Sequence, residues 1–152
     1  MTTEKYLLRL SWLTNTILSR LDKLEIDRSR LTNMVAPTDK EPVQTSPKDT
    51  MCEILSNVVD LDRETDGYVT EYKRIMAQVD TLTAPYAPAY LFRRYGRGQS
   101  VNEIASDMKI SRSTAYRVHR EALEEFEKMW GETYLRAKDS KELAVLEQSD
   151  TL

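Results

Sequence analysis

The chain has 152 residues, 40% of them hydrophobic, which is enough for one ordinary domain or two small modules. It contains only four glycines and five prolines, and it is rich in Leu, Glu, Lys and Arg. This composition predicts an all-α fold, because it favours helices and includes few of the glycines and prolines that tight β-turns use. The formal net charge of −3 argues, over the whole chain, against a partner as negative as nucleic acid.

The first residues, MTTEKYLLRLSWL, carry charges at Glu4, Lys5 and Arg9 and do not have the pattern of a signal peptide. No run of about 18 apolar residues is present, so we expect no membrane contact and a cytoplasmic location. A single cysteine, Cys52, and a single histidine, His119, cannot form a zinc site. A glycine-lysine phosphate loop is also missing. We therefore expect no metal, no cofactor and no enzymatic activity.

Two long amphipathic helices are predicted from apolar residues at helical spacing, over about 3–33 and 49–82. The prolines of VAPTDKEPVQTSPKD predict a loop over 34–48. The two helices are similar in length, so they can pair as an antiparallel hairpin across this loop. The VQTSPKD segment is either a simple connection or a partner-binding loop. Three residues are suitable starts for the second helix: Ser46, Pro47 and Asp49.

Both long helices repeat their apolar residues every seven positions, which favours coiled-coil packing. A two-helix hairpin buries only one stripe from each helix, so a second copy of the chain is a natural partner. We predict a homodimer; the alternative is that the stripe packs on the rest of the same chain. The predicted oligomerisation residues are Leu10, Ile17, Leu24, Leu31, Val58, Leu61, Tyr72, Ile75 and Val79.

A second domain is predicted after the hairpin, because Pro85 and Pro88 interrupt the long helix. A short helix through LFRRY should end at GRG, where Gly96 or Gly98 can take the left-handed conformation. Beyond Trp130 the helical pattern is weaker. The predicted organisation is a hairpin over 1–83, a helix-turn-helix domain over 84–130, and a partly helical tail over 131–152.

The helix-turn-helix prediction rests on two serine caps. Ser100 is followed three residues later by Glu103, the capping-box spacing, and Ser111 is placed to start a second helix that runs to about Lys128. Between them, Lys109 and Ile110 form the turn. Apolar residues should join the two helices: Ile104, Ala105, Met108, Ala115, Val118 and Ala122. Such a pair places the start of its second helix in the major groove of DNA.

The outer face of the second helix carries side chains suited to DNA. Arginine can bind guanine with two hydrogen bonds, and short hydroxyls can contact phosphates or base edges. The predicted DNA-binding residues on this helix are Ser111, Arg112, Ser113, Thr114, Tyr116, Arg117 and Arg120. Between Arg93 and Arg120, seven basic residues oppose two acidic ones, giving a local net charge of +5. This segregation predicts attraction to phosphate despite the acidic chain.

The segment QSVNEIASDMKISRSTAYRVHREAL, Gln99 to Leu123, resembles the helix-turn-helix of bacterial sigma-factor region 4. The wider layout resembles the ArpU and RinA late transcriptional regulators of Gram-positive bacteriophages. This resemblance implies a phage or prophage activator of late genes in a bacterial host cell. It also implies that Gln99 and Ser100 lie at a phosphate-contacting helix start. Lys109 departs from many such motifs, which have glycine there for a positive φ.

The sequence therefore predicts a dimeric regulator that binds specific double-stranded DNA and contacts phosphate through Arg94 as well. Two other functions remain open. One is a DNA-packaging component such as a small terminase subunit, which also joins a helix-turn-helix to an oligomerising helical region. The other is an interaction module that binds host RNA polymerase through the hairpin.

Overall fold

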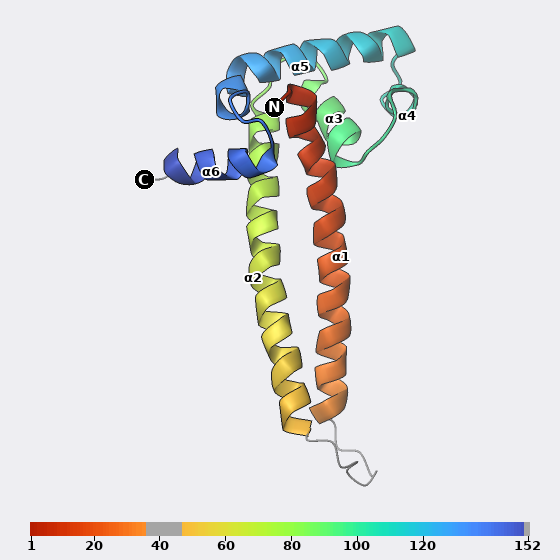
Figure 1. The fold of residues 1–152 in the computed structure, drawn as a ribbon. Coiled ribbons are helices and arrows are strands. Elements are labelled where there is room, and N and C mark those ends of the chain that lie inside the picture. The colour runs from red at the N-terminus through yellow and green to blue at the C-terminus, as the bar shows by residue number, and fades with distance from the viewer. Residues whose placement is uncertain (36–46, 151–152) are drawn as a thin grey trace. The chain divides into compact units, whose positions relative to one another are not determined.

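The computed structural model describes residues 1–35 and 47–150 (Figure 1). Over these residues the chain forms helices and no strand, and the predicted all-α class is confirmed. The elements in chain order are α1 (Thr3–Val35), α2 (Pro47–Asp80), α3 (Ala87–Leu91), the π-helical turn η1 (Phe92–Gly96), α4 (Val101–Asp107), α5 (Arg112–Tyr134) and α6 (Ser140–Asp150).

The two long helices begin and end within two residues of their predicted bounds. α1 starts at Thr3, and α2 starts at Pro47, where a missing backbone N–H has no cost in a first helical turn. VQTSPKD covers residues 43–49, of which 47–49 form the first turn of α2. Its other residues, including Ser46 as a helix start, lie outside the described part of the chain. The end of the tail at 151–152 lies outside it as well.

By contact density the chain divides into two compact units. The hairpin unit is Asn15–Glu71, and the helix-turn-helix unit combines Met1–Thr14 with Tyr72–Leu152. The first turns of α1 and the last turns of α2 therefore belong with the C-terminal helices. The division of the sequence at residues 83 and 130 stays a prediction about domains.

The hairpin unit consists of an antiparallel pair of helices with a thin apolar seam. Leu24 of α1 and Ile54 of α2 are buried in it. Thr65 is buried too, and its hydroxyl donates to the Leu61 carbonyl at 2.6 Å, which satisfies the polar group within its own helix. Two ion pairs join basic residues of α1 to acidic residues of α2: Arg20 with Glu64, and Arg28 with Asp62 at 3.6 Å.

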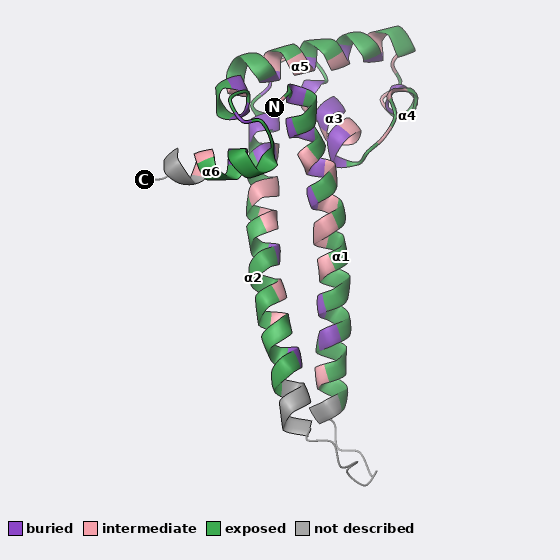
Figure 2. Cartoon of the chain, viewed as in Figure 1, coloured by how far each residue is buried: buried purple, intermediate pink, exposed green. Residues whose placement is uncertain are grey.

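Buried residues are frequent in the helices of the helix-turn-helix unit (Figure 2). Fully buried aromatic residues form its core. The rings of Tyr6 and Tyr134 stack with centroids 4.4 Å apart, and Phe126 lies 5.9 Å from Tyr6. The Tyr6 hydroxyl donates to Gln78 Oε1 at 2.7 Å. Burial of each ring contributes about 2–3 kcal/mol. These contacts attach the ends of the hairpin helices to α5.

α5 is longer than the sequence suggested, because it continues past Gly131 to Tyr134 instead of ending near Lys128. Gly131 is buried and lies within α5, so this glycine does not end the helix. The extension brings Tyr134 into the aromatic core. After it, Ala137 and Leu143 are also buried.

A single chain already covers part of the predicted oligomerisation stripe. Leu24 is buried in the hairpin unit, and Leu10, Ile75 and Val79 are buried in the helix-turn-helix unit. The remaining members are half-buried: Ile17, Leu31, Val58, Leu61 and Tyr72. Packing within the chain therefore accounts for much of the heptad pattern, and oligomerisation through these residues stays a prediction.

Candidate nucleic-acid interface

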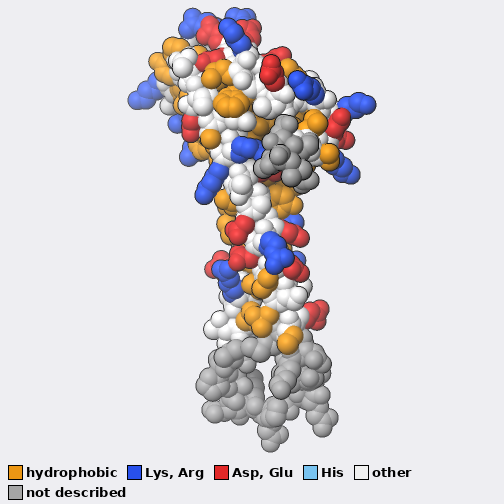
Figure 3. Space-filling view, turned by 90° about the vertical axis from the view of Figure 1, so that its left-hand side faces the viewer, with side chains coloured by type: hydrophobic (Ala, Val, Ile, Leu, Met, Phe, Trp, Pro, Cys, Tyr) orange, Lys and Arg blue, Asp and Glu red, His pale blue; other side chains and the backbone are white. Residues whose placement is uncertain are grey.

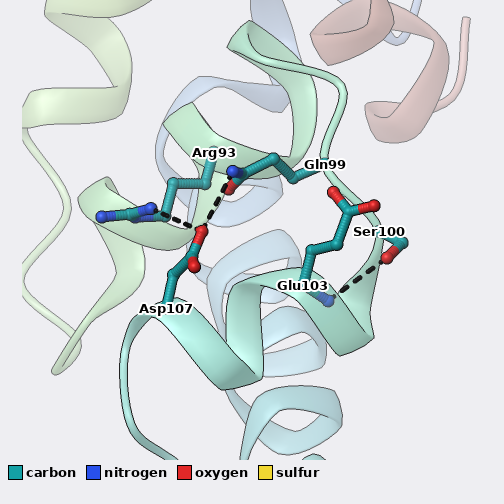
Figure 4. Close-up of polar contacts among 5 residues, drawn as sticks. All are labelled: Arg93, Gln99, Ser100, Glu103 and Asp107. Atoms are coloured by element: carbon teal, nitrogen blue, oxygen red, sulfur yellow. Dashed lines mark hydrogen bonds and ion pairs between the residues drawn. The ribbon is translucent and has the colours of Figure 1, made fainter.

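α4 begins at the predicted cap. The Ser100 hydroxyl accepts a hydrogen bond from the Glu103 backbone N–H at 3.2 Å, and Ser100 has the extended backbone of an N-cap (Figure 4). Ile104 and Ala105 are buried, as the spacing predicted. The small Ala105 lets α5 cross close to α4. The cap therefore fixes where α4 starts and which of its faces meets α5.

The turn between α4 and α5 depends on an unusual backbone conformation at Lys109. Its φ is 56°, the left-handed region that favours glycine. The Ile110 N–H donates to the Ala105 carbonyl at 3.0 Å, which closes the end of α4. A side chain in this conformation costs about 1 kcal/mol. The sharp turn expected from the resemblance is thus present, and Lys109 occupies the position where many such motifs have glycine.

Ser111 caps α5 as predicted. Its hydroxyl accepts from the Thr114 backbone N–H at 3.1 Å and donates to the Thr114 hydroxyl at 2.7 Å. The Ser113 hydroxyl lies 3.3 Å away. Three hydroxyls therefore surround the positive end of the α5 dipole, an arrangement that favours an approaching phosphate.

α5 separates its inner and outer faces as the sequence indicated. Ala115, Val118 and Ala122 are buried against the rest of the unit. The exposed members of the predicted surface are Ser111, Arg112, Ser113, Tyr116, Arg117 and Arg120, with Thr114 half-exposed. Internal packing therefore does not use this outer face.

Two of these outer arginines have neighbours that orient them. The Arg112 guanidinium lies 5.7 Å from the centre of the Tyr116 ring, and Arg117 lies 4.0 Å from Glu121 one helical turn later. Such exposed contacts are weak, worth about 0.2–1 kcal/mol, so a DNA ligand can replace them.

The three predicted contacts outside α5 are engaged within the chain. Ser100 caps α4, and the Gln99 amide donates to Asp107 at 3.1 Å. Arg94 donates to the Gln99 carbonyl at 3.3 Å. Arg94 Nε and Gln99 Oε1 are buried and have no hydrogen-bond partner among the residues that the structure describes. DNA contact by these residues stays a prediction; their placement shows that they also fix the loop before α4.

Asp107 joins three parts of the domain. Its carboxylate accepts from Arg93 of η1 at 3.2 Å and from Gln99 of the following loop at 3.1 Å. Figure 4 shows both side chains converging on it from above the end of α4. The loop itself turns at Gly98, whose φ of 70° uses the left-handed conformation expected at GRG. Asp107 therefore holds η1 and α4 at a fixed separation.

His119 lies on the inner side of α5 between two tyrosines. The Tyr90 hydroxyl is 3.0 Å from Nδ1, and the Tyr95 hydroxyl is 3.1 Å from Nε2. Burial, together with the Arg94 charge, lowers the pKa of His119 below its usual 6.5, and burial raises the pKa of both tyrosines to about 12. All three are therefore neutral near pH 7. One imidazole nitrogen donates, the other accepts, and the network ties α5 to α3 and η1.

Glu125 fixes α5 to the connection between α2 and α3. Its carboxylate accepts from the Thr83 N–H at 2.8 Å, the Thr83 hydroxyl at 2.9 Å and the Ala84 N–H at 3.0 Å. The backbone hydrogen bond from Thr83 is the main reason that the pKa of Glu125 is lowered from its usual 4.5. The negative charge of Glu125 thus holds the turn that leads into the domain.

Sequence reasoning missed Asp107 and Glu125. In the sequence, Asp107 is only one of the two acidic residues between Arg93 and Arg120, and Glu125 is one of several glutamates that follow this segment. Their partners lie 8 to 42 residues away, so helical periodicity carries no signal of them. His119, which the sequence excluded only from a zinc site, bonds to two tyrosines on the inner side of α5.

Two properties of the described chain concern other kinds of site. None of its helices is long and apolar enough to cross a membrane. Within the same residues, no group of three or more His, Cys, Asp or Glu side chains is arranged to hold a metal ion.

Comparison with known proteins identifies the same segment. Residues 86–122 match the family model of the helix-turn-helix domain of resolvase. They span α3, η1, α4 and the first half of α5. No curated protein and no solved structure matched the chain. The match gives no support to sigma-factor region 4 or to the ArpU and RinA group in particular. The chain therefore carries a DNA-binding helix-turn-helix domain similar to that of resolvases.

Proposed function

We propose that the chain is a sequence-specific DNA-binding transcriptional regulator that places the start of α5 in the major groove. The observation that carries this proposal is the exposed outer face of α5, from which Arg112, Tyr116 and Arg117 project. The inner face of the same helix is buried against the rest of the unit. A helix held this firmly can present its side chains to base edges in one register.

Charge distribution supports DNA as the ligand. The net charge of +5 between Arg93 and Arg120 contrasts with −3 for the whole chain. Salt-dependent attraction to phosphates follows from such a local excess. Within it, Arg117 and Arg112 are the proposed base readers, because each can bond guanine with two parallel hydrogen bonds. Ser111, Ser113 and the exposed Arg120 are the proposed phosphate contacts.

A homodimer is part of the proposal, and a face of the hairpin unit supports it. Leu18, Leu55 and Val59 each follow a residue that faces the seam, and each is exposed, at 57%, 45% and 54%. A one-residue step turns a helix by about 100°, and in antiparallel helices this moves both sets to the same side. In the space-filling view, hydrophobic side chains interrupt the charged surface of this unit (Figure 3).

Charge favours a second copy as the occupant of this face. Between residues 52 and 71, α2 carries six acidic residues and one basic residue, whereas α1 carries four basic and three acidic residues between 15 and 33. When two hairpins pack face to face, α1 of one copy can lie against α2 of the other, and the pairs that Arg20 and Arg28 make with Glu64 and Asp62 within one chain can then form between the copies.

The resemblance to ArpU and RinA regulators extends the proposal to phage late genes. The resolvase match is confined to the DNA-binding domain, so it supplies no argument for strand cleavage, and we propose that the protein acts by binding without catalysis. A small terminase subunit would share the helix-turn-helix but assemble as a ring. Native mass spectrometry separates these proposals, because a dimer supports the regulator and more than four subunits would support packaging.

Selection from a random library of DNA duplexes with the full-length chain tests sequence specificity. We expect enrichment of one motif, present as two half-sites whose spacing follows the dimer. The control is the double variant Arg112→Ala/Arg117→Ala, which should fold but enrich nothing. Equal enrichment by both proteins would overturn the proposal that these arginines read bases.

The selected duplex then tests Arg117 by itself. We expect Arg117→Ala to weaken binding to that duplex by about 1–3 kcal/mol and to leave binding to a scrambled duplex nearly unchanged. Arg120→Ala should weaken both alike and reduce the salt dependence, as loss of a phosphate contact does. Equal losses on the two duplexes from Arg117→Ala would assign Arg117 to the phosphate backbone.

A further inference from the structure

A groove with a volume of about 390 Å³ lies along the first turns of α1, away from the DNA-binding face of α5. One wall comes from α1, with Lys5, Leu8, Arg9 and Trp12, and the other from the connection to α6, with Lys138. All of these residues belong to the helix-turn-helix unit. Neither the helix-turn-helix match nor the proposed DNA contacts include them.

The floor of this groove is apolar and open. Leu8 and Trp12 are four residues apart, so they lie on one side of α1, and they are 49% and 45% exposed. The opposite side of the same turns carries the buried Tyr6, Leu7 and Leu10. The Arg9 guanidinium lies 4.3 Å from the centre of the Trp12 ring and holds it against the helix. An exposed tryptophan flanked by leucine is typical of an interface anchor.

The rim of the groove is basic. Lys5, Arg9 and Lys138 are opposed there by one acidic residue, Asp139. The Asp139 carboxylate already accepts hydrogen bonds from the Lys141 and Glu142 backbone N–H groups at 3.0 and 2.9 Å, which caps α6. Asp139 is therefore used internally, and Lys5 and Lys138 give the rim a basic excess.

We propose that this groove binds an acidic peptide segment of a partner protein, with one or two large apolar residues seated on Leu8 and Trp12. The charge of the rim selects for Asp and Glu, and the exposed floor selects for leucine or an aromatic side chain. A DNA backbone would meet the cations but gain little from the floor. The groove also lies beside the far end of α5, about 30 Å along the helix from Arg112.

The test uses a random dodecapeptide library displayed on phage and selected against the full-length chain. Selected peptides should be rich in Asp and Glu and contain a leucine or aromatic residue. A peptide from this selection should bind at least tenfold more weakly to Lys5→Glu/Lys138→Glu and to Trp12→Ser. Trp12 fluorescence in a Trp130→Phe background reports binding, because Trp130 is then no longer a second emitter.

The matched control is Lys73→Glu/Lys128→Glu, which makes the same change of charge at two exposed lysines outside the groove. It should retain peptide affinity. Selection without acidic enrichment, or equal loss in both double variants, would overturn the proposal. Displacement of the peptide by a scrambled 30-base-pair duplex would assign the groove to nucleic acid instead. The Trp12→Ser variant should bind DNA as well as the unmodified chain does. Failure of the peptide-binding proposal would therefore leave the proposed DNA-binding function intact, and the reverse also holds.

Discussion

The two compact units differ in how they bury apolar residues. In the helix-turn-helix unit, four aromatic side chains are fully buried, from α1, α3 and α5: Tyr6, Tyr90, Phe126 and Tyr134. The hairpin unit has a seam in which Leu24 and Ile54 are buried, while Leu18 and Val59 stay more than half exposed. The helix-turn-helix unit thus has a core to which several helices contribute side chains. In the hairpin unit, two helices side by side can each shield only one apolar stripe from solvent.

This difference has a consequence for function. A recognition helix must be held rigidly, and the aromatic core, the His119 network and the Glu125 contacts hold α5 from three sides. The hairpin unit has no comparable requirement within one chain, and its exposed apolar residues are available to a second copy.

The largest expected effect is loss of the core of the helix-turn-helix unit. Phe126→Ala should lower the free energy of unfolding by about 3–5 kcal/mol, because it leaves a cavity among Tyr6 and Tyr134. Denaturant titration followed by circular dichroism measures it. Leu55→Ala in the hairpin unit is the matched change and should cost less than about 0.5 kcal/mol at low protein concentration. If both substitutions lowered the free energy of unfolding by similar amounts, the two units would not differ in how strongly their apolar residues are packed.

His119 should give the domain a dependence on pH. Because the pKa of His119 is lowered in the fold, the unfolded chain binds more protons below its usual pKa of 6.5. The stability that neutral His119 contributes is therefore present above pH 6.5. It is lost as the pH falls from 6.5 through the lowered pKa of the folded state. Tyr90 of α3, Tyr95 and Arg94 of η1, and Glu4 of α1 surround the ring.

His119→Gln tests this directly and should cost about 1–2 kcal/mol at pH 8, since two tyrosine hydroxyls lose their partner. Unfolding titrations between pH 8 and pH 5 should show the two proteins converging as the pH falls. A constant difference across this range would mean that protonation of His119 does not weaken the domain.

Glu125→Gln should have a smaller effect, about 0.5–1 kcal/mol, because its carboxylate is largely exposed to solvent screening. The lowered pKa of Glu125 means that its contribution is present above its usual 4.5 and disappears as the pH falls through the lowered value. Thermal unfolding at pH 7 and pH 3 measures both. Glu124→Gln, at the exposed neighbouring position, is the control and should change neither.

A small effect of opposite sign is expected in the hairpin unit. Gly67 lies within α2, and a Cβ there would meet no atom within 4 Å, so Gly67→Ala should raise the free energy of unfolding by about 0.5–1 kcal/mol. Gly96→Ala should instead destabilise, because its Cβ would lie 2.9 Å from the Phe92 ring. Unfolding curves of the two variants would then move in opposite directions.

Local signals in the sequence predicted much of the fold. Helical spacing of leucines placed α1 and α2, and the prolines ended α2 near Thr83, because these features act over a few residues. Ser100 and Ser111 identified both helix starts for the same reason. The two caps also located the turn at Lys109 and Ile110, but the left-handed backbone of Lys109 was not predicted, because the residue is not a glycine.

The candidate site was predicted only in part. The exposed face of α5 follows from helix geometry once Ala115 and Val118 are recognised as its inner side. The contacts of Asp107 and Glu125 could not be predicted, since each joins segments whose approach depends on how several helices pack.

By itself, the sequence determined where α1, α4 and α5 start, which face of each is apolar, and that a capped, basic helix-turn-helix lies near the C-terminus. Capping, backbone preference and periodicity are properties of neighbouring residues, so they can be read without a fold. The tertiary structure decided that Tyr6 and Gln78 from the ends of the hairpin belong to the same compact unit as α5. It also decided that Leu8 and Trp12 remain open beside a basic rim. These features depend on contacts between residues far apart in the chain, which only close packing of the whole unit brings together.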